Sequence, residues 1–341
     1  MNTAKQPTLR DVATRAGVSP ATVSRCVNQP ESVKAAKRAN ILSAIDELGY
    51  VPHGAARALA SNRTRMIGAV FPSLDSTLFG GMLDALQGEI ATAGYTLVIA
   101  SSNYDIEKEY TTVLNLISSG VDALTLVGAA HSARTYNVMQ RKNIPYVLNW
   151  ISSASGEHPC VGFDNFEAAA KVTRYLLDLG HKKFGMISGL VEHNDRAAQR
   201  RNGVQDTLRQ RGLELDPSLV IQRPFDVDEG RDAFRLLMSM PSPPTAIVCG
   251  GEPFAYGSIF EAREMDINVP QDVSITGFDD MWIASQIRPA LTTVQTPRRK
   301  IGIEVGRHLL AKLSGATIAK PKPLETRLIV RDSTGPVSHT D

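Results

Sequence analysis

Two short amphipathic helices joined by a glycine turn constrain this chain more than any other part of its sequence. Residues 8–28 read TLRDVATRAGVSPATVSRCVN. Thr8 followed by Asp11 three residues later is typical of a helix start, and Gly17 is placed to end that helix. Apolar residues recur between them at helical spacing and predict one buried face. That face comprises Leu9, Val12, Ala13 and Ala16.

The second predicted helix has an apolar side and a polar side. Ser19 caps it, and Pro20 takes the first helical position, where its missing N–H costs nothing. Val23 and Val27 are expected to point inward. In a helix-turn-helix, the second helix enters the major groove of DNA, and Arg25 could donate to O6 and N7 of a guanine. The outward face comprises Ala21, Thr22, Ser24, Arg25 and Asn28.

The first 65 residues carry an excess of positive charge. They contain ten Lys and Arg residues against four Asp and Glu residues, a net charge of +6, whereas the whole chain of 341 residues carries only +2. Such asymmetry between segments is an electrostatic footprint for a polyanion. Because any helical hairpin in a protein core can show the same periodicity, this charge is what favours a DNA-binding role.

The N-terminal stretch resembles the lac and gal repressor family of bacterial transcription factors. The segments DVATRAGVSPATVSRCVNQPESV and AIDELGYVPHGAARALAS match that family's headpiece. The likeness continues through IGAVFPSL, GFDNFEAA, LGHKKFGMISG, RRNG, VPQDVSITGFDD and PALTTV to about residue 331. The resemblance implies a sequence-specific transcriptional regulator, expected to be a repressor, that binds double-stranded operator DNA as a homodimer. It also implies a small-molecule effector that controls operator affinity.

The same resemblance assigns DNA contacts within the headpiece. Pro20, Ala21 and Arg25 match the positions that vary between family members to read different operators. Cys26 stands where an apolar residue is usual, and we expect it to be a small core side chain. The expected contacts to the DNA backbone come from Thr8, Ser19, Thr22, Ser24 and Asn28. The third helix, which closes the small core, is expected to contribute Ile41, Ile45, Leu48 and Tyr50.

The stretch GAARALASN resembles the family's hinge helix, which orders only when two headpieces sit on DNA together. By that resemblance Leu59 inserts into the minor groove, Ala56 packs helix against helix and Arg57 faces a phosphate. His53 replaces the asparagine that is usual after the proline in this family. This difference affects one of the expected contacts with the DNA backbone. A plain linker between domains is the alternative interpretation of this segment.

From Met66 onward, short apolar runs alternate with longer amphipathic stretches, an order typical of parallel sheets covered on both faces. The predicted fold is an all-α helix-turn-helix headpiece followed by an α/β, two-lobed, periplasmic-binding-protein-like effector domain with doubly wound parallel sheets. The resemblance implies three crossings between the lobes, near Phe163, Thr293 and Lys320. It places the helix around residues 299–313 in the first lobe and the final strand in the second.

These features predict four segments. They are a DNA-binding headpiece (1–52), a hinge helix or linker (53–65), a two-lobed effector-binding and dimerisation domain (66–332) and a flexible tail (333–341). The tail sequence DSTGPVSHTD lacks the heptad leucines that would support a tetramer, so a dimer is expected.

Open α/β sheets bind ligands beyond the carboxyl ends of their strands, and two facing lobes form a cleft there. The resemblance assigns the main ligand contacts to Asn149, Arg200 and Asp279. Gly251 and Glu252 stand where the family usually has Asn-Asp, so one hydrogen bond to the effector is lost or made by water. The full set of expected effector-binding residues is Ser73, Asp75, Ser76, Phe79, Asn149, Phe163, Arg200, Phe225, Gly251, Glu252 and Asp279.

These residue types favour a sugar or a sugar acid as the effector. An arginine fork suits hydroxyls or a carboxylate, and an acidic side chain suits paired sugar hydroxyls. A purine-like base or another metabolite is the alternative. The sequence leaves open whether the effector releases the protein from DNA or recruits it to DNA.

No motif in the sequence points to catalysis, a cofactor or a metal. Asp279 with Asp280, and Asp164 with Glu167, are carboxylate pairs, but helix capping is the commoner role of such residues. The seven histidines lack metal spacing, and no GxGxxG or GxxxxGK[ST] follows a strand. The three cysteines form no CxxC, which is typical of a reducing cytosol.

A sugar-binding transport protein with the same two-lobed architecture is the remote alternative. Such a protein needs an export signal, and MNTAKQPTLRDV contains no apolar core of signal length. No run of about 18 apolar residues marks a membrane span either. The basic headpiece therefore favours a cytoplasmic regulator with no membrane partner.

Overall fold

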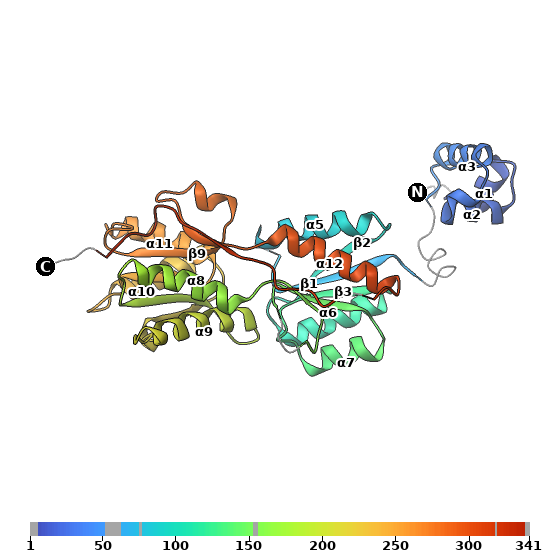
Figure 1. The fold of residues 1–341 in the computed structure, drawn as a ribbon. Coiled ribbons are helices and arrows are strands. Elements are labelled where there is room, and N and C mark those ends of the chain that lie inside the picture. The colour runs from blue at the N-terminus through green and yellow to red at the C-terminus, as the bar shows by residue number, and fades with distance from the viewer. Residues whose placement is uncertain (1–5, 52–62, 75–76, 153–155, 318, 338–341) are drawn as a thin grey trace. The chain divides into compact units, whose positions relative to one another are not determined.

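The computed structural model describes residues 6–51, 63–74, 77–152, 156–317 and 319–337. The chain divides into two compact units, Met1–Arg65 and Met66–Asp341 (Figure 1). The hinge residues predicted to contact DNA and two of the predicted effector contacts lie outside the described residues. These are His53, Ala56, Arg57, Leu59, Asp75 and Ser76.

The described part of the first unit is a bundle of three α-helices, and capping residues mark the starts of the first two. Thr8 and Asp11 form the predicted capping box, because the Thr8 hydroxyl accepts from the Asp11 N–H and the Asp11 carboxylate accepts from the Thr8 N–H. The Ser19 side chain accepts from the Thr22 N–H at the next helix start. Gly17 has a φ of +65°, which suits the turn between these helices. The helices are α1 (Leu9–Arg15), α2 (Pro20–Asn28) and α3 (Ala35–Leu48).

The headpiece core confirms the prediction for Cys26 and corrects the one for Val27. Val23 is fully buried and Cys26 is 2% exposed. The side of α2 that packs against α3 therefore carries positions 23 and 26, which are three residues apart. Val27 is only half-buried and lies outside this core. The core cluster comprises Val12, Ala13, Val23, Cys26, Val33, Ile41, Ala44 and Tyr50.

The second unit begins with lobe 1, a five-stranded parallel sheet of order β2-β1-β3-β4-β5. Buried residues from α5 and α12 cover one face and those from α6 and α7 the other. The strands are β1 (Met66–Phe71), β2 (Thr96–Ser101), β3 (Ala123–Val127), β4 (Tyr146–Asn149) and β5 (Cys160–Val161). The helices are α5 (Gly80–Ala91), α6 (Ile106–Ser118), α7 (Ala133–Arg141) and α12 (Arg298–Leu313).

The packing of α12 against α5 confirms that this late helix belongs to lobe 1. The two helices approach closely because α12 carries glycine at the contact. A Cβ on Gly302 would lie 2.2 Å from the carbonyl oxygen of Met82. One on Gly306 would lie 2.9 Å from the Glu89 side chain.

Lobe 2 is a six-stranded sheet of order β11-β10-β9-β8-β6-β7, in which only the edge pair β10 and β11 is antiparallel among the described pairings. Helices α8 and α9 cover one face, and α10 and α11 the other. The strands are β6 (Phe184–Gly189), β7 (Val220–Arg223), β8 (Ala246–Cys249), β9 (Ser274–Asp279), β10 (Thr292–Gln295) and β11 (Arg327–Ile329). The helices are α8 (Asn165–Asp178), α9 (Asp195–Gln210), α10 (Val227–Met238) and α11 (Glu252–Glu264).

Residues 333–337, after β11, pack on lobe 2, unlike the flexible tail predicted for residues 333–341, of which 338–341 lie outside the described residues. Ser333 is fully buried, and its hydroxyl donates to the carbonyl of Ile275 at 2.6 Å and accepts from the N–H of Thr292 at 2.9 Å. The Val337 N–H donates to the carbonyl of Leu179. Small polar side chains thus pair with main-chain groups of β9 and β10, and residues 333–337 are part of lobe 2.

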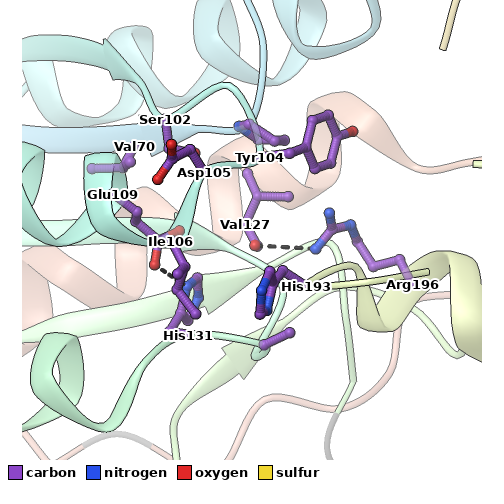
Figure 2. Close-up of a pocket in the computed structure, with 12 residues that line it drawn as sticks. Val70, Ser102, Tyr104, Asp105, Ile106, Glu109, Val127, His131, His193 and Arg196 are labelled. Carbon is purple, nitrogen blue, oxygen red and sulfur yellow. Dashed lines mark hydrogen bonds and ion pairs between the residues drawn. The ribbon is translucent and has the colours of Figure 1, made fainter. Parts of the chain in front are cut away.

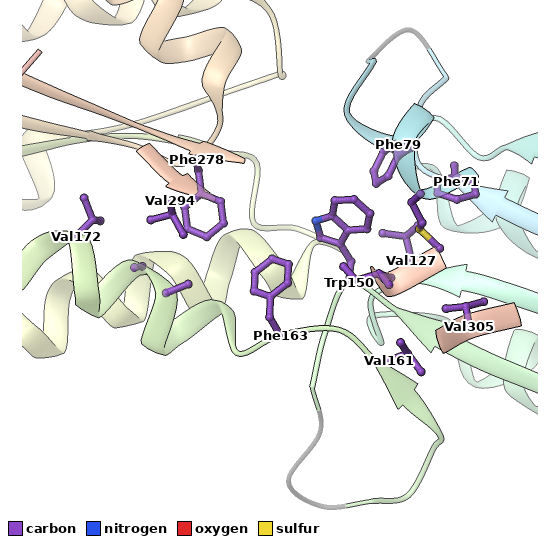
Figure 3. Packing of buried hydrophobic residues seen from close by; sticks show 14 of the residues in the cluster. Phe71, Phe79, Val127, Trp150, Val161, Phe163, Val172, Phe278, Val294 and Val305 are labelled. Atoms are coloured by element: carbon purple, nitrogen blue, oxygen red, sulfur yellow. The ribbon is translucent and has the colours of Figure 1, made fainter. Parts of the chain in front are cut away.

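Aromatic side chains from both lobes meet where the chain first crosses between them (Figure 3). Trp150 is 1% exposed, and its ring centroid lies 5.0 Å from that of Phe79 in lobe 1. The ring centroid of Phe163, which follows β5 where the chain crosses, lies 6.2 Å from that of Phe278 in lobe 2. The buried cluster therefore extends through the crossing into both lobes.

Candidate ligand and nucleic-acid sites

Arg200 is held at the carboxyl ends of β8 and β9 by directed contacts. Its Nε donates to Asn165 Oδ1 at 2.9 Å, and its Nη1 donates to the Gly250 carbonyl at 2.7 Å. The guanidinium carbon lies 3.7 Å from the centroid of the Phe278 ring, a cation–π contact. Burial lowers the pKa of Arg200 to about 10, and the charge of Asp279 opposes this shift. The guanidinium is therefore a fixed, desolvated cation.

Asp279 supplies a buried carboxylate at the end of β9. It is 3% exposed and has a φ of +112°, a conformation that side-chain-bearing residues rarely adopt. The Thr296 hydroxyl donates to its Oδ1 at 3.2 Å. Burial raises the pKa of Asp279 to about 6, whereas the charges of Arg200 and Arg298 lower it. Among the described contacts no ion pair joins Arg200 to Asp279, so each keeps hydrogen-bonding capacity.

Asn149 and Trp150 present two buried polar atoms that have no partner in the described structure, Asn149 Oδ1 and Trp150 Nε1. The Asn149 amide is fixed because its Nδ2 donates to Thr125 Oγ1 at 2.8 Å. Asn165 links this region to the arginine, since its Nδ2 donates to the Trp150 carbonyl at 3.0 Å while its Oδ1 accepts from Arg200. Leaving a buried polar group unpaired costs about 1–3 kcal/mol. An acceptor and a donor are therefore available near the guanidinium.

Phe225 lies in a cradle made by two glycines of lobe 2. A Cβ on Gly189 would lie 2.4 Å from its Cε2, and one on Gly251 would lie 2.7 Å from its Cε1. Its ring stacks on Phe254 at 5.0 Å and on Tyr104 of lobe 1 at 6.4 Å. Gly251 thus has a packing reason, because an asparagine there would collide with Phe225.

Glu252 is 1% exposed, and its carboxylate is engaged within lobe 2. It accepts from the Tyr256 hydroxyl, from the Met281 N–H at 2.9 Å and from Thr293 Oγ1 at 3.0 Å. Burial raises the pKa of Glu252 to about 7, although these hydrogen bonds lower it. Glu252 therefore holds the loop after β9 through the Met281 N–H, and its contact with the effector stays a prediction.

A pocket between the lobes includes residues that sequence reasoning missed (Figure 2). Tyr104 follows the carboxyl end of β2, so the strand-end rule that selected Ser73 could also have found it. Burial raises the pKa of Tyr104, and the neighbouring charge of Arg196 opposes the shift. The lining comprises Val70, Pro72, Ser102, Tyr104, Asp105, Ile106, Glu109, Val127, Ala130, His131, His193 and Arg196.

The remaining predicted ligand residues are distributed around this region. Phe79 and Phe163 belong to the aromatic cluster at the first crossing, and both are buried. Ser73 is half-buried after β1. Arg200 contacts this cluster through the Phe278 ring, and Asn165 links it to Trp150, the chain neighbour of Asn149. Phe225 approaches lobe 1 through Tyr104.

The exposed side of α2 gathers the residues predicted to contact DNA. Arg25 and Asn28 are exposed, and Asn28 Nδ2 donates to Ser24 Oγ at 3.4 Å. The hydroxyls of Ser19 and Thr22 lie 2.9 Å apart at the start of the helix. This surface offers one guanidinium, one amide and several hydroxyls, the groups that bind base edges and phosphates.

The described residues hold no group of three or more His, Cys, Asp or Glu side chains that could bind a metal ion. They also contain no helix that is both long and apolar enough to cross a membrane.

Comparison with known proteins gives two family matches. Residues 8–53 match the model of bacterial regulatory proteins of the lacI family. Residues 173–334 match the model of a periplasmic binding protein-like domain. The first match coincides with the three helices of the headpiece, and the second covers most of lobe 2 together with α12 of lobe 1.

The curated relatives span nearly the whole chain. The HTH-type transcriptional repressor CytR of Escherichia coli (strain K12) is 31% identical over 328 residues, covering 96% of this chain and 96% of the relative. The HTH-type transcriptional repressor PurR of Erwinia tasmaniensis is 32% identical over 309 residues, covering 90% of each chain.

Solved structures agree with these matches. The lac repressor dimer bound to operator and the anti-inducer ONPF superposes with a TM-score of 0.86 at 25% identity, covering 97% of this chain and all of that one. The transcriptional regulator CelR in complex with cellobiose gives a TM-score of 0.71 at 28% identity, covering 96% and 99%.

Proposed function

The chain belongs to the lacI family of bacterial regulatory proteins, and from this premise we propose that it is an operator-binding transcriptional repressor controlled by a small molecule held between its lobes. In this proposal it is a cytoplasmic homodimer rather than an enzyme. Relatives covering at least 90% of the chain are transcriptional repressors. Two linked headpieces multiply affinity for a paired site through effective concentration.

The observation that carries the ligand proposal is the set of uncompensated polar groups beside Arg200. Its guanidinium is fixed by Asn165 and Gly250 but pairs with no carboxylate in the described structure. The unpartnered atoms of Asn149 and Trp150 lie in the neighbourhood linked to it through Asn165. Such a buried, half-satisfied polar network is suited to a ligand that completes it.

We propose a sugar or a sugar acid as the effector. The carboxylate of Asp279 accepts from hydroxyls, and the guanidinium of Arg200 binds a hydroxyl or a carboxylate. The aromatic rings at the first crossing offer flat apolar surfaces for the C–H face of a sugar ring. The structurally similar regulator CelR was solved in complex with cellobiose, which supports this class.

A purine or nucleoside is the second candidate, favoured by one specific observation. Tyr104 and Phe225 face each other across the lobes with ring planes only 21° apart. A planar base could insert between or beside these rings. CytR and PurR, the relatives named above, are regulators in the same family.

The test combines ligand screening with DNA binding. Thermal shift of the full chain against gluconate, ribose, cellobiose, adenosine and hypoxanthine identifies a ligand, because a ligand bound only by the folded state raises the melting temperature. Fluorescence anisotropy then measures the affinity for promoter fragments from genes beside its own, with and without that ligand. The double variant Arg200→Ala, Asp279→Ala should bind DNA but lose the response.

The control is Arg209→Ala, which removes an exposed arginine of the same helix that pairs with Asp206. It should keep both DNA binding and the ligand response. A normal response in the double variant would place the ligand elsewhere. Equal affinity of the unmodified protein for promoter and random duplexes at moderate salt would overturn the repressor function itself.

A further inference from the structure

Two residues at the start of α9 reach from lobe 2 to the end of strand β3 in lobe 1. Arg196 Nη1 donates to the Val127 carbonyl at 3.1 Å (Figure 2). It also donates to Asp195 Oδ1 at 3.0 Å. Asp195 Oδ2 accepts from the Ala129 N–H at 2.8 Å. The two side chains thus bind the main chain on either side of Gly128. Two hydrogen bonds thus join the lobes at this point, and the bond between Arg196 and Asp195 within α9 supports both.

Gly128 makes this contact possible. Its φ is +85°, and a Cβ built on it would lie 1.9 Å from Arg196 Nη1 and 2.5 Å from Asp195 Oδ1. The guanidinium therefore occupies space that any other residue would fill. The side chain of Arg196 is only 8% exposed and that of Asp195 20%, so water competes little for these bonds.

The turn that receives these side chains is itself rigidly held inside lobe 1. The Gly128 N–H donates to the Asn149 carbonyl at 2.9 Å, and the Gly128 carbonyl lies 3.0 Å from His131 Nε2. His131 Nδ1 lies 2.8 Å from the Glu109 carboxylate. The Tyr136 hydroxyl donates to the carbonyl of the next residue, Ala129, at 2.9 Å. Because these lobe 1 hydrogen bonds hold Gly128 and Ala129 in place, the turn is a preformed docking point for lobe 2.

The same helix connects this contact to the ligand region. Arg196 and Arg200 stand four residues apart on α9, so they lie on one side of the helix, one turn apart. Arg196 also lines the pocket between the lobes next to Tyr104. A movement of α9 that breaks the Val127 contact must therefore also move the guanidinium proposed to hold the ligand.

We propose that Asp195 and Arg196 form a latch that fixes the closed arrangement of the two lobes, with Gly128 as its receiving position. Ligand binding at Arg200 and closure of the latch are coupled through α9. This inference rests on the proposed function, because it specifies how the ligand cleft of that proposal is held shut. Asp195 acts as a positioning residue that orients Arg196 and binds the Ala129 N–H.

The experiment measures the distance between the lobes without any ligand or DNA. Spin labels are attached to cysteines introduced at the exposed positions Lys142, after α7, and Gln210, at the end of α9. The three native cysteines are buried, so labelling in the folded protein is selective for the introduced sites. Double electron–electron resonance on the full chain then gives the distribution of distances.

Asp195→Ala and Gly128→Ala should each shift the distance distribution to longer and broader values. The matched control is Gly180→Ala, because Gly180 also has a positive φ, +93°, but a Cβ there meets nothing within 4 Å. Its distribution should equal that of the unmodified chain. Asp195→Asn, which keeps an acceptor for the Ala129 N–H but loses the charge, should give an intermediate shift.

Identical distributions in the unmodified chain, Asp195→Ala and Asp195→Asn would overturn the latch. The same holds if Gly180→Ala opens the lobes as far as Gly128→Ala, because backbone strain alone would then explain the change. If Gly128→Ala fails to fold by circular dichroism, the two Asp195 variants decide. If the distances do not change, the latch is overturned but operator binding and the ligand response are not contradicted. If the DNA-binding test fails, the repressor function is overturned but the distance measurements still decide the latch.

Discussion

Phe225 occupies the space that a side chain on Gly251 would need. The Cβ of any residue at position 251 would lie 2.7 Å from Phe225 Cε1, well inside van der Waals contact. The lack of a side chain at position 251 therefore makes room for the aromatic ring of Phe225. Position 251 and position 225 should accept changes only as a pair.

Gly251→Asn should lower the free energy of unfolding by about 1–3 kcal/mol, because the cradle around the ring is overpacked. Phe225→Leu in the same chain should recover part of that loss, which a double-mutant cycle from urea denaturation measures. Gly88→Ala, on α5 with nothing within 4 Å of the added Cβ, serves as the control and should not destabilise. A Gly251→Asn chain as stable as the original would contradict this account of the cradle.

Arg25→Ala should abolish discrimination between operator and random duplex. A bidentate contact to guanine is worth about 1–3 kcal/mol of discrimination, and the guanidinium of Arg25 is exposed on the recognition side of α2. Arg10→Ala removes an exposed arginine of α1 and should weaken binding to all duplexes alike. Anisotropy titrations at fixed salt separate these patterns. Retained sequence preference in Arg25→Ala would assign base reading to another residue.

Glu252 should make stability depend on pH. Burial raises its pKa to about 7 from the ordinary glutamate value of 4.5, so between these pH values the folded chain keeps a proton that the unfolded chain has released. The free energy of unfolding therefore falls as pH rises through this window, by about 3 kcal/mol for this group.

Glu252→Gln should remove that dependence, because the amide carries no charge at any pH. Urea denaturation at pH 5 and pH 8 should show a smaller loss of stability in this variant than in the unmodified chain. Glu214→Gln, at an exposed position of the same lobe, is the control and should follow the unmodified profile. Parallel profiles in Glu252→Gln and the unmodified chain would show that the buried carboxylate does not titrate as described.

Cys26 should tolerate valine and reject serine. Its side chain is 2% exposed in the headpiece core, and burial raises the pKa of its thiol. Cys26→Val should change stability by less than about 1.5 kcal/mol. Cys26→Ser buries a hydroxyl among apolar side chains and should cost about 1–3 kcal/mol. Thermal unfolding followed by circular dichroism checks both variants, and equal melting temperatures would argue against a core role.

Local signals in the sequence predicted much of the fold. The capping residues Thr8 and Ser19 fixed the starts of α1 and α2, and apolar runs located most strands, because these features depend on neighbours in the chain. Which of Cys26 and Val27 is the more deeply buried could not be predicted in this way, because it depends on where α3 packs against α2. The order of Ser333 depends likewise on β9 and β10, some 40 to 60 residues away along the chain.

In the candidate ligand site, too, residues marked by local sequence could be predicted, whereas those that depend on distant contacts could not. Arg200 and Asp279 follow from family resemblance and strand-end position, and the structure gives both of them buried, charged environments. Arg196 was missed because its partner Val127 is 69 residues away. A glycine directly after a buried strand, as at Gly128, was the one available signal that another chain segment approaches closely there.

The anchoring of Ser333 and Val337 in lobe 2 limits how the C-terminal end can be altered. A truncation at Arg331 would strip the Thr292 N–H and the Ile275 carbonyl of their hydroxyl partner and open the sheet edge to solvent. Affinity tags and fluorescent fusions therefore belong after Val337, where no described pairing is interrupted. Because the chain enters lobe 2, leaves it for α12 and returns through β11, excising either lobe as a separate fragment would require rejoining broken ends.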